Sequence, residues 1–318
     1  MPCRRCLIAR AVLFFLAFSS AATVGPASAE AKPRCFGAAA RDAENPCTNP
    51  ALARSVTPGV IQALRDPGPP CAALKRTRQP EVCDFGTPKK RARATFALIG
   101  DSHASHWRGA LATVARDKRW RGLMLYHTRC PLSMARKPDS DRAKCYRWRE
   151  SVFAYMAAHP ELETVFVSQN SGSPVTPPPG EDETAYAMKG YADAWRALPP
   201  SVKNIFVLRD VPHNDKSGNA CVRRVLRKRG RFDDVCHRPR EEALGSDEAA
   251  EAARTSDDPR VHSIDLSDHM CDSRLCYQVV GGVLVIKDFG HLTRVFSETL
   301  GPYLLRAVDR ILGTHPAG

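Results

Sequence analysis

Hydrophobic residues in this chain of 318 residues follow two kinds of spacing that alternate along the sequence. Short β-favouring runs predict buried strands, and apolar residues at helical spacing predict helices. The predicted strands span residues 96–99, 122–126, 164–168, 204–209 and 261–266. The predicted helices span residues 107–114, 146–158, 184–198 and 294–312. This alternation predicts an α/β fold, a three-layer α/β/α sandwich with a mostly parallel sheet.

The segment before residue 94 lacks this alternation. Closely spaced prolines in residues 30–93 break any long helix, and four cysteines lie among them. We therefore predict a disulfide-stapled N-terminal extension over residues 30–93 and an α/β domain over residues 94–318. The basic run at 89–93 is predicted to be a solvated loop.

The first 29 residues have the pattern of a secretion signal. Three arginines precede an apolar segment at 11–24, and Ala27-Ser-Ala29 resembles a cleavage site. The alternative is a membrane anchor, but two serines interrupt a segment that is already short for a spanning helix. The sequence thus predicts a signal peptide over residues 1–29 and an exported protein, periplasmic or extracellular.

Twelve cysteines are present, and ten remain after the predicted signal. An even number in an exported chain favours disulfides, each removing about 2–3 kcal/mol of unfolded-state freedom. The alternative is zinc binding, but the sequence has no tight Cys-x-x-Cys pair in this part. Bridging between sequential neighbours gives the predicted pairs Cys35–Cys47, Cys71–Cys83, Cys130–Cys145, Cys221–Cys236 and Cys271–Cys276.

The formal net charge of the whole chain is +13. A basic exported protein can meet anionic glycans, cell-wall polymers or lipid headgroups. Export removes nucleic acid as a routine partner, so we expect none.

The strongest chemical signal is the sequence Gly100-Asp101-Ser102-His103, which directly follows a predicted strand. A strand-to-helix turn can expose a serine, and the amides of the following helix can stabilise developing negative charge. Far along the chain, Asp288 and His291 have the spacing that lets a carboxylate orient an imidazole. Ser102, His291 and Asp288 are therefore the predicted nucleophile, general base and orienting acid.

Other polar residues near Ser102 have alternative roles. His103 and His106 compete with His291 for the role of base, and Asp101 is expected to brace the turn. For the oxyanion hole we predict the Ser102 amide and the Asn170 side chain; their rivals are Gln169 and the amide of Gly172.

Metal-dependent hydrolysis is a further alternative, with Asp101, His103 and His106 as ligands. No further acidic cluster accompanies these three residues, so we expect neither a metal nor a cofactor.

Together these features resemble the SGNH (GDSL-like) hydrolase superfamily, in the block Gly100-Asp101-Ser102 and in the block from Asp288 to His291. More narrowly, the chain resembles the extracytoplasmic SGNH domain often fused to membrane acyltransferases that O-acetylate polysaccharides. That likeness covers residues 35 to about 310 and includes the motifs Cys35-Phe-Gly, Cys130-Pro131, Asp210-Val-Pro212 and the run 265–276. The resemblance implies a flavodoxin-like sheet order.

Two departures from the superfamily pattern affect the oxyanion hole. The second-block glycine has no match after the second strand, and the third-block Gly-x-Asn-Asp is absent, with residues 168–170 its nearest counterpart.

The resemblance implies a serine esterase or O-acyltransferase that acts on O-acyl groups, chiefly O-acetyl, of a cell-envelope polysaccharide through an acyl-serine intermediate. The substrate would be an acylated glycan, and a separate membrane acyltransferase would be the partner if the family's donor system is used. The alternative is a non-catalytic carbohydrate-binding or assembly module on the same fold.

Overall fold

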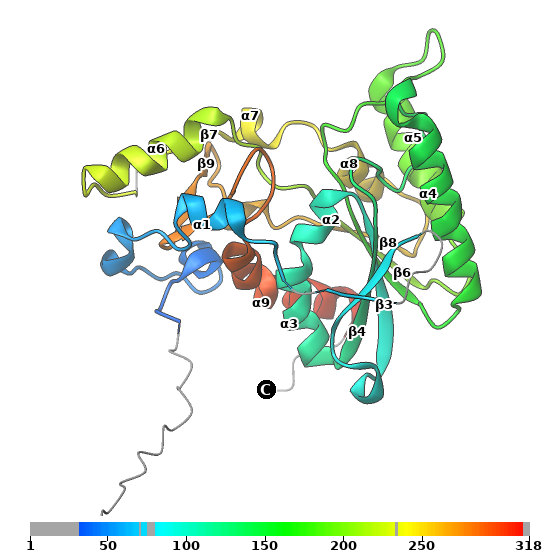
Figure 1. Ribbon diagram of the computed structural model, residues 1–318, viewed down its shortest axis with the longest axis horizontal. Helices are drawn as coiled ribbons and strands as arrows, with labels where there is room; N and C mark the ends of the chain where they lie inside the picture. The colour runs from blue at the N-terminus through cyan, green and yellow to red at the C-terminus, as the bar shows by residue number, and fades with distance from the viewer. Residues whose placement is uncertain (1–31, 70, 75–79, 233–234, 314–318) are drawn as a thin grey trace, which may run out of the picture. The chain divides into compact units, whose positions relative to one another are not determined.

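Five of the strands in a seven-stranded sheet are parallel, and the strand order is β1-β2-β4-β3-β5-β6-β8 (Figure 1). The parallel strands, paired in the order β4-β3-β5-β6-β8, are β3 (Ala94–Gly100), β4 (Trp120–Tyr126), β5 (Thr164–Ser168), β6 (Asn204–Leu208) and β8 (Val261–Ile264). The predicted mostly parallel sheet and its flavodoxin-like order are confirmed. Strands β6 and β8 end slightly earlier than the sequence pattern predicts.

The computed structural model describes residues 32–69, 71–74, 80–232 and 235–313. The predicted signal peptide therefore lies outside the described residues. From Pro33 onward the chain forms one compact unit. Among the described residues, no helix combines the length and the apolarity needed to cross a bilayer.

The segment before residue 94 contributes to the main sheet. Strand β2 (Val82–Gly86) pairs antiparallel with β4, and β1 (Ala72–Ala73) pairs antiparallel with β2. The hydrophobic pattern of the sequence does not predict these two strands. The division of the chain at residue 93 stays a prediction. The basic run just before that division includes the exposed 3-10 helix η3 (Lys89–Arg91).

Helices cover both faces of the sheet. Figure 1 shows α3 (Arg108–Lys118) and α9 (Arg294–Leu312) on one side, and α4 (Asp139–Ala158) and α5 (Glu183–Arg196) on the other, where α8 (Glu248–Arg254) also packs. Side chains alternate along β3, so Phe96 and Leu98 face α3 and α9, whereas Ala97 and Ile99 face α4 and α5. The three-layer sandwich is confirmed.

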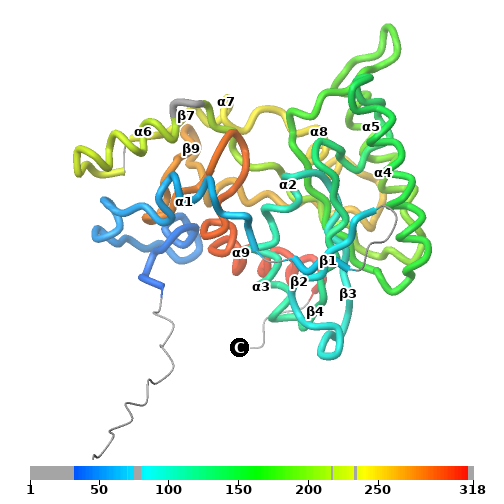
Figure 2. Tube along the Cα trace, viewed as in Figure 1, coloured from blue at the N-terminus to red at the C-terminus, as the bar shows by residue number. Residues whose placement is uncertain are grey.

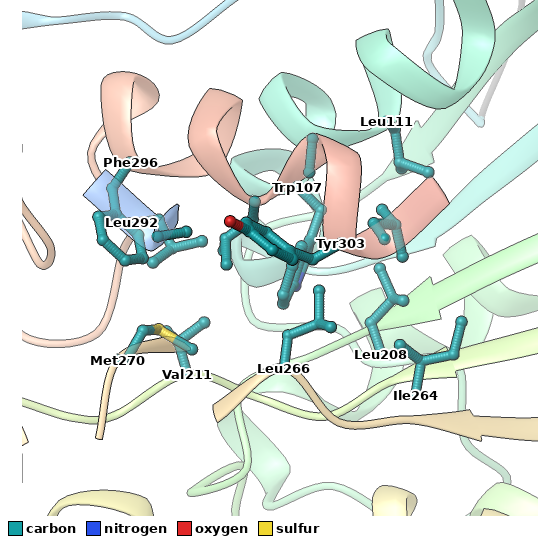
Figure 3. Packing of buried hydrophobic residues seen from close by; sticks show 14 of the residues in the cluster. Trp107, Leu111, Leu208, Val211, Ile264, Leu266, Met270, Leu292, Phe296 and Tyr303 are labelled. Atoms are coloured by element: carbon teal, nitrogen blue, oxygen red, sulfur yellow. The ribbon is translucent and has the colours of Figure 1, made fainter. Parts of the chain in front are cut away.

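The core beneath α9 holds the two ends of the domain together. Trp107 and Leu111, which follow the serine turn, belong to the same buried cluster as Phe296 of α9 (Figure 3). Burying one such side chain contributes roughly 1.5–3 kcal/mol. This packing fixes the N-terminus of α9, and therefore the loop immediately before it.

The chain leaves β3 through a position that only glycine can occupy. Gly100 has a φ of +153°, and a Cβ atom there would lie 1.8 Å from the carbonyl oxygen of Ser168. Gly100 pairs with Tyr126 on one side and with Ser168 on the other. The turn therefore emerges between the ends of β4 and β5, where connections leave in opposite directions and where ligands bind in such sheets.

Smaller elements complete the described fold. The helix α2 (Ser102–His106) follows the turn directly, so the predicted helix at 107–114 is the second of two short helices. The remaining elements are η1 (Gly37–Arg41), η2 (Pro50–Arg54), α1 (Val60–Arg65), α6 (Lys216–Arg227), β7 (His237–Pro239), α7 (Arg240–Leu244), η4 (Ser267–His269), β9 (Leu275–Tyr277), β10 (Val279–Val280) and β11 (Val283–Leu284).

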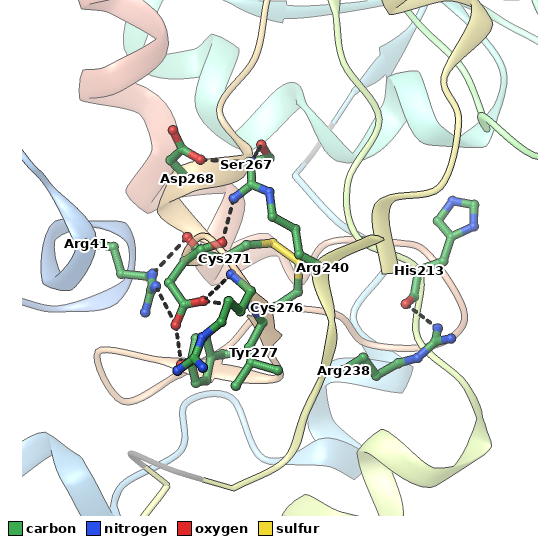
Figure 4. The surroundings of a disulfide bond; sticks show 12 residues. Arg41, His213, Arg238, Arg240, Ser267, Asp268, Cys271, Cys276 and Tyr277 are labelled. Carbon is green, nitrogen blue, oxygen red and sulfur yellow. Dashed lines mark hydrogen bonds and ion pairs between the residues drawn. A yellow bond between two sulfur atoms is a disulfide. The ribbon is translucent and has the colours of Figure 1, made fainter. Parts of the chain in front are cut away.

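Five disulfides join the sequential neighbours that the sequence predicts. Around Cys271–Cys276, the Arg240 guanidinium donates to the Asp272 carbonyl and to Ser267 Oγ, each at 2.8 Å (Figure 4). In the same figure, Arg238 donates to the His213 carbonyl at 2.9 Å. This disulfide-bonded region thus supports the segment that follows β6.

Candidate active site

Ser102 is the first residue of α2, and Asp101 is the cap of that helix. The Asp101 carboxylate is buried and accepts from the amides of His103 at 2.8 Å and Asn170 at 3.0 Å. Burial raises the pKa of Asp101, although the neighbouring His103 charge and both amides act in the opposite direction. As predicted, Asp101 braces the turn, and it ties the end of β3 to the loop after β5.

Asp288 and His291 form a dyad in the loop before α9. His291 Nδ1 lies 2.9 Å from Asp288 Oδ1 and 3.0 Å from Oδ2, and Oδ1 also accepts the His291 amide at 2.9 Å. Burial opposes ionisation of Asp288, but the bonds from His291 outweigh it and lower its pKa to about 2. A carboxylate at Nδ1 directs the lone pair of the neutral imidazole to Nε2.

The structure brings this dyad to the residues next to Ser102. The His291 ring centroid lies 4.7 Å from that of His103 and 6.1 Å from that of His106. A Cβ atom on Gly290 would lie 2.9 Å from His103 Cε1, which shows how closely the loop approaches α2. Two segments almost 190 residues apart in the sequence therefore meet at the carboxyl end of β3.

A second carboxylate, that of Asp210, contacts His103, whose ring lies against that of His291. Asp210 is buried after β6, and it contacts His103 Nδ1 at 2.7 Å and His213 Nε2 at 2.9 Å. Burial alone would lower the pKa of His103, but the Asp210 charge and hydrogen bond outweigh it and raise that pKa. Burial likewise opposes ionisation of Asp210, and the two histidines hold its pKa well below the usual value.

Sequence reasoning missed the role of this cluster. Asp210 contributed only to the family resemblance, and His213 was not singled out. A signal was present, because Asp210 and His213 directly follow a predicted parallel strand, and the carboxyl ends of such strands meet at one edge of the sheet.

His106, a sequence-based rival for the role of base, is buried without a hydrogen-bonding partner on either ring nitrogen within the described part of the chain. Burial holds its pKa well below the usual value. No described carboxylate bonds to its ring, in contrast to the rings of His291 and His103.

The candidate oxyanion donors differ in availability. The Ser102 N–H is at the first position of α2, where no intrahelical acceptor exists. The Gly172 N–H donates to Asn170 Oδ1 at 2.8 Å, so it is already used. The backbone amide of Asn170 is bound to Asp101, which leaves its side-chain NH₂. Gln169 is buried, and its Nε2 has no partner among the described residues.

His103, Asp210 and His213 also have the residue types of a metal site, with ligand atoms within 4.8 Å of one another. However, Asp210 Oδ1 accepts from His103 Nδ1 and the Val211 amide, and Oδ2 accepts from His213 Nε2 and the Ser171 amide. Four donors occupy both carboxylate oxygens. The arrangement fits a hydrogen-bonded network better than a cation, and a metal remains a hypothesis for a chelator to test.

The fold and the serine turn define the class of protein. The sequence model of the SGNH domain (fused to AT3 domains) matches residues 70–306, which is most of the chain. The chain therefore belongs to this family of SGNH domains, and the resemblance seen in the sequence is confirmed.

Several solved structures match the chain, among them the following two. The periplasmic domain of a lipopolysaccharide acetyltransferase from Salmonella ser. Paratyphi A is 16% identical, with a TM-score of 0.51 over 69% of this chain and 84% of that domain. The carboxylesterase CesB from Bacillus subtilis is 14% identical, with a TM-score of 0.31 over 81% of this chain and 97% of the esterase. No curated protein matches the sequence. At these identities the likeness to the acetyltransferase domain shows the fold.

Proposed function

We propose that this chain is an exported serine esterase or O-acyltransferase that acts on O-acyl groups, chiefly O-acetyl, of cell-envelope polysaccharide. The observation that carries the proposal is the Asp288–His291 dyad beside the turn that bears Ser102. Membership of a family of SGNH domains fused to AT3 domains supports acyl chemistry, and the fold likeness to a periplasmic domain supports export. Five disulfides are also typical of a protein that folds in an oxidising compartment.

In the first half-reaction, Ser102 Oγ attacks the acyl carbonyl carbon while its proton moves to His291 Nε2. The electron pair of the carbonyl moves to oxygen, and the Ser102 amide and the side-chain NH₂ of Asn170 are the proposed donors to that oxyanion. When the intermediate collapses, the bond to the sugar oxygen breaks and His291 returns the proton to that oxygen. The products are an acyl-serine and a free sugar hydroxyl.

In the second half-reaction, an acceptor hydroxyl gives its proton to His291 as its oxygen attacks the acyl carbon of the acyl-serine. When this intermediate collapses, the bond from the acyl carbon to Ser102 Oγ breaks and His291 returns the proton to Ser102 Oγ. When water is the acceptor, the product is a carboxylic acid and the protein acts as an esterase. When a sugar hydroxyl is the acceptor, the product is a new ester and the protein acts as a transferase. The same residues serve both outcomes. In the transferase case, the acyl donor would be supplied by a membrane acyltransferase, because the family is described as SGNH domains fused to AT3 domains.

The Asp210 cluster holds the site in position in this scheme. Asp210 bonds to His103, whose ring lies against that of His291. The geometry therefore supports one dyad that moves the proton and one that fixes the turn. If the roles were exchanged, His103 would be the base, and substitutions at Asp210 and Asp288 distinguish the two cases.

Acetate release from O-acetylated polysaccharide tests the proposal. We expect release by the wild-type protein, loss in Ser102→Ala, and wild-type release in the matched control Ser151→Ala, because Ser151 lies on α4 and its hydroxyl donates to the Trp148 carbonyl of the same helix. Adding deacetylated sugar acceptors then separates hydrolysis from transfer. Equal release by Ser102→Ala and wild type would contradict the proposal, and chelator-sensitive release would favour the metal alternative.

The second candidate is a non-catalytic carbohydrate-binding or assembly module. One observation favours it: the Gly172 amide and the Asn170 backbone amide, which lie where oxyanion donors are expected, are used by internal bonds. Binding of the glycan without release of acetate, equal in wild type and Ser102→Ala, would support this alternative.

A further inference from the structure

A groove away from the candidate active site lies between α1, α6 and the start of α9. Its cavity volume is about 810 Å³, and its lining includes Ile61, Arg65, Arg223 and Leu226. Helices α1 and α6 lie side by side at the edge of the molecule away from the sheet (Figure 2). We call the surface formed by Ile61, Arg65, Arg223, Leu226, Arg227 and Lys228 the α1–α6 face.

The α1–α6 face is strongly basic. Residues 216–231 contain seven lysines and arginines and no acidic residue. Five of them, Arg223, Arg224, Arg227, Lys228 and Arg229, are exposed and form no ion pair within the described residues. Elsewhere on the surface, arginines such as Arg254 and Arg260 contact an acidic side chain. The positive charge of these five side chains is therefore not neutralised by any ion pair among the described residues.

The same face exposes aliphatic side chains. Ile61 is 60% exposed and Leu226 is 39% exposed, and both line the groove beside arginines. Leu64, on the same short helix as Ile61, is 52% exposed. On the inner side, Val222 of α6 is buried against Val60 and Ala63 of α1. Helix α6 thus has one apolar stripe in the core and a basic outer surface that includes a leucine.

We propose that the α1–α6 face docks this protein on an anionic membrane surface, with Ile61 and Leu226 entering the boundary between headgroups and acyl chains. Arginine and lysine next to exposed aliphatic residues are the combination that binds at such interfaces, because charge attracts the protein and apolar burial retains it. An acidic polysaccharide would satisfy the charge alone. Among the described residues that line the groove there is no aromatic ring on which a sugar could stack, and the exposed apolar atoms favour a lipid surface.

The face is connected to the loop of the candidate active site. Asn219 on α6 donates to the Lys287 carbonyl at 2.7 Å, one residue before Asp288. Lys287 Nζ reaches the Asp66 carbonyl at 3.4 Å, and Arg294 at the start of α9 contacts the Asp66 carboxylate at 3.1 Å. Docking through this face would therefore hold the loop of Asp288 and His291 at a fixed orientation to the membrane.

The test is co-sedimentation of the full chain with phosphatidylglycerol vesicles and with phosphatidylcholine vesicles. It is done in a Ser102→Ala background, so the result is independent of catalysis. We expect binding to phosphatidylglycerol only, weakened about 30-fold or more by the pair Arg227→Glu and Lys228→Glu, since each basic side chain contributes about fivefold at a membrane.

The matched control is the pair Lys89→Glu and Lys90→Glu, which changes the net charge equally on an exposed turn far along the sequence. We expect this pair to retain nearly wild-type binding. In the wild-type background, both pairs should keep wild-type hydrolysis of 4-nitrophenyl acetate, and circular dichroism checks their fold.

Three outcomes would overturn the proposal. The first is no binding to phosphatidylglycerol, and the second is equal weakening by both charge-reversal pairs, which would indicate net charge alone. The third is binding to polygalacturonate rather than vesicles, with loss in the Arg227 and Lys228 pair, which would assign the face to an acidic glycan. A further pair, Ile61→Ser and Leu226→Ser, should weaken vesicle binding about tenfold, and unchanged binding would refute insertion of these side chains.

Discussion

The substitution Asp288→Asn tests how the proposed base is oriented. Asp288 Oδ1 accepts the Gly290 and His291 amides, so the carbonyl of an introduced amide must occupy that position. Its NH₂ group then takes the place of Oδ2, 3.0 Å from His291 Nδ1. A donor facing Nδ1 favours the tautomer with its proton on Nε2, which cannot accept the proton of Ser102.

The size of the effect follows from two contributions. The pKa of Asp288 is lowered from 3.8 to about 2 by its bonds with His291, against the opposing effect of burial, which corresponds to roughly 2.4 kcal/mol. Because the Asp288 side chain is 37% exposed, solvent screening reduces this contribution to about 1 kcal/mol. In the productive tautomer, the Nδ1–H of His291 would face the introduced NH₂ group and have no acceptor there, which adds roughly 1–3 kcal/mol.

Together these contributions predict a fall of about 10²–10³-fold in kcat/KM for Asp288→Asn. The assay is hydrolysis of 4-nitrophenyl acetate, with Asp139→Asn as the control because Asp139 is 89% exposed at the start of α4. A rate for Asp288→Asn within about threefold of wild type, together with inactivity of Asp210→Asn, would refute the reasoning and assign the role of base to His103.

Three other predictions concern stability. Burial raises the pKa of Asp247 from 3.8 to about 6, although hydrogen bonds from backbone amides oppose the shift. The folded state therefore binds the Asp247 proton more tightly than the unfolded state does. As a result, the free energy of unfolding should fall by about 3 kcal/mol as pH rises from 4 to 6. Urea titrations should show this fall in wild type but not in Asp247→Asn, and identical pH profiles would contradict it. Reduction of the disulfides should lower the melting temperature without directly affecting catalysis, since each bridge contributes about 2–4 kcal/mol to the free energy of unfolding. Activity that depends on one free thiol in an intact fold would disprove this prediction. Gly100→Ala should destabilise the fold by more than about 3 kcal/mol, because its Cβ would overlap the Ser168 carbonyl, whereas Gly59→Ala, with open space around it, should denature near wild type.

The sheet could be predicted because its central strands carry their signal locally. Residues 96–99 and 164–168 are short apolar runs bounded by polar residues, and both lie within observed strands. Strands β1 and β2 were not predicted, since β2 is short and includes Cys83, Asp84 and Gly86. These segments form strands because the edge of β4 is open for β2 to pair with. The local sequence pattern does not show that this pairing is available.

The candidate site was predictable where residues are close in sequence. Asp288 and His291 are three residues apart, so one turn suffices to join them. The contact between His103 and Asp210 joins the ends of β3 and β6, which are separated by more than a hundred residues. Only the strand order fixes that pairing, so the second carboxylate could not be assigned from spacing.

The central claim is that Ser102 is activated by His291. Labelling with a fluorophosphonate probe, followed by identification of the modified peptide, measures this most directly. We expect modification at Ser102 in wild type, none in Ser102→Ala and a much slower rate in His291→Ala, with His159→Ala as a control whose imidazole stacks on Tyr155 instead. A folded wild-type protein that is never labelled, or one labelled equally fast without the His291 imidazole, would contradict the account.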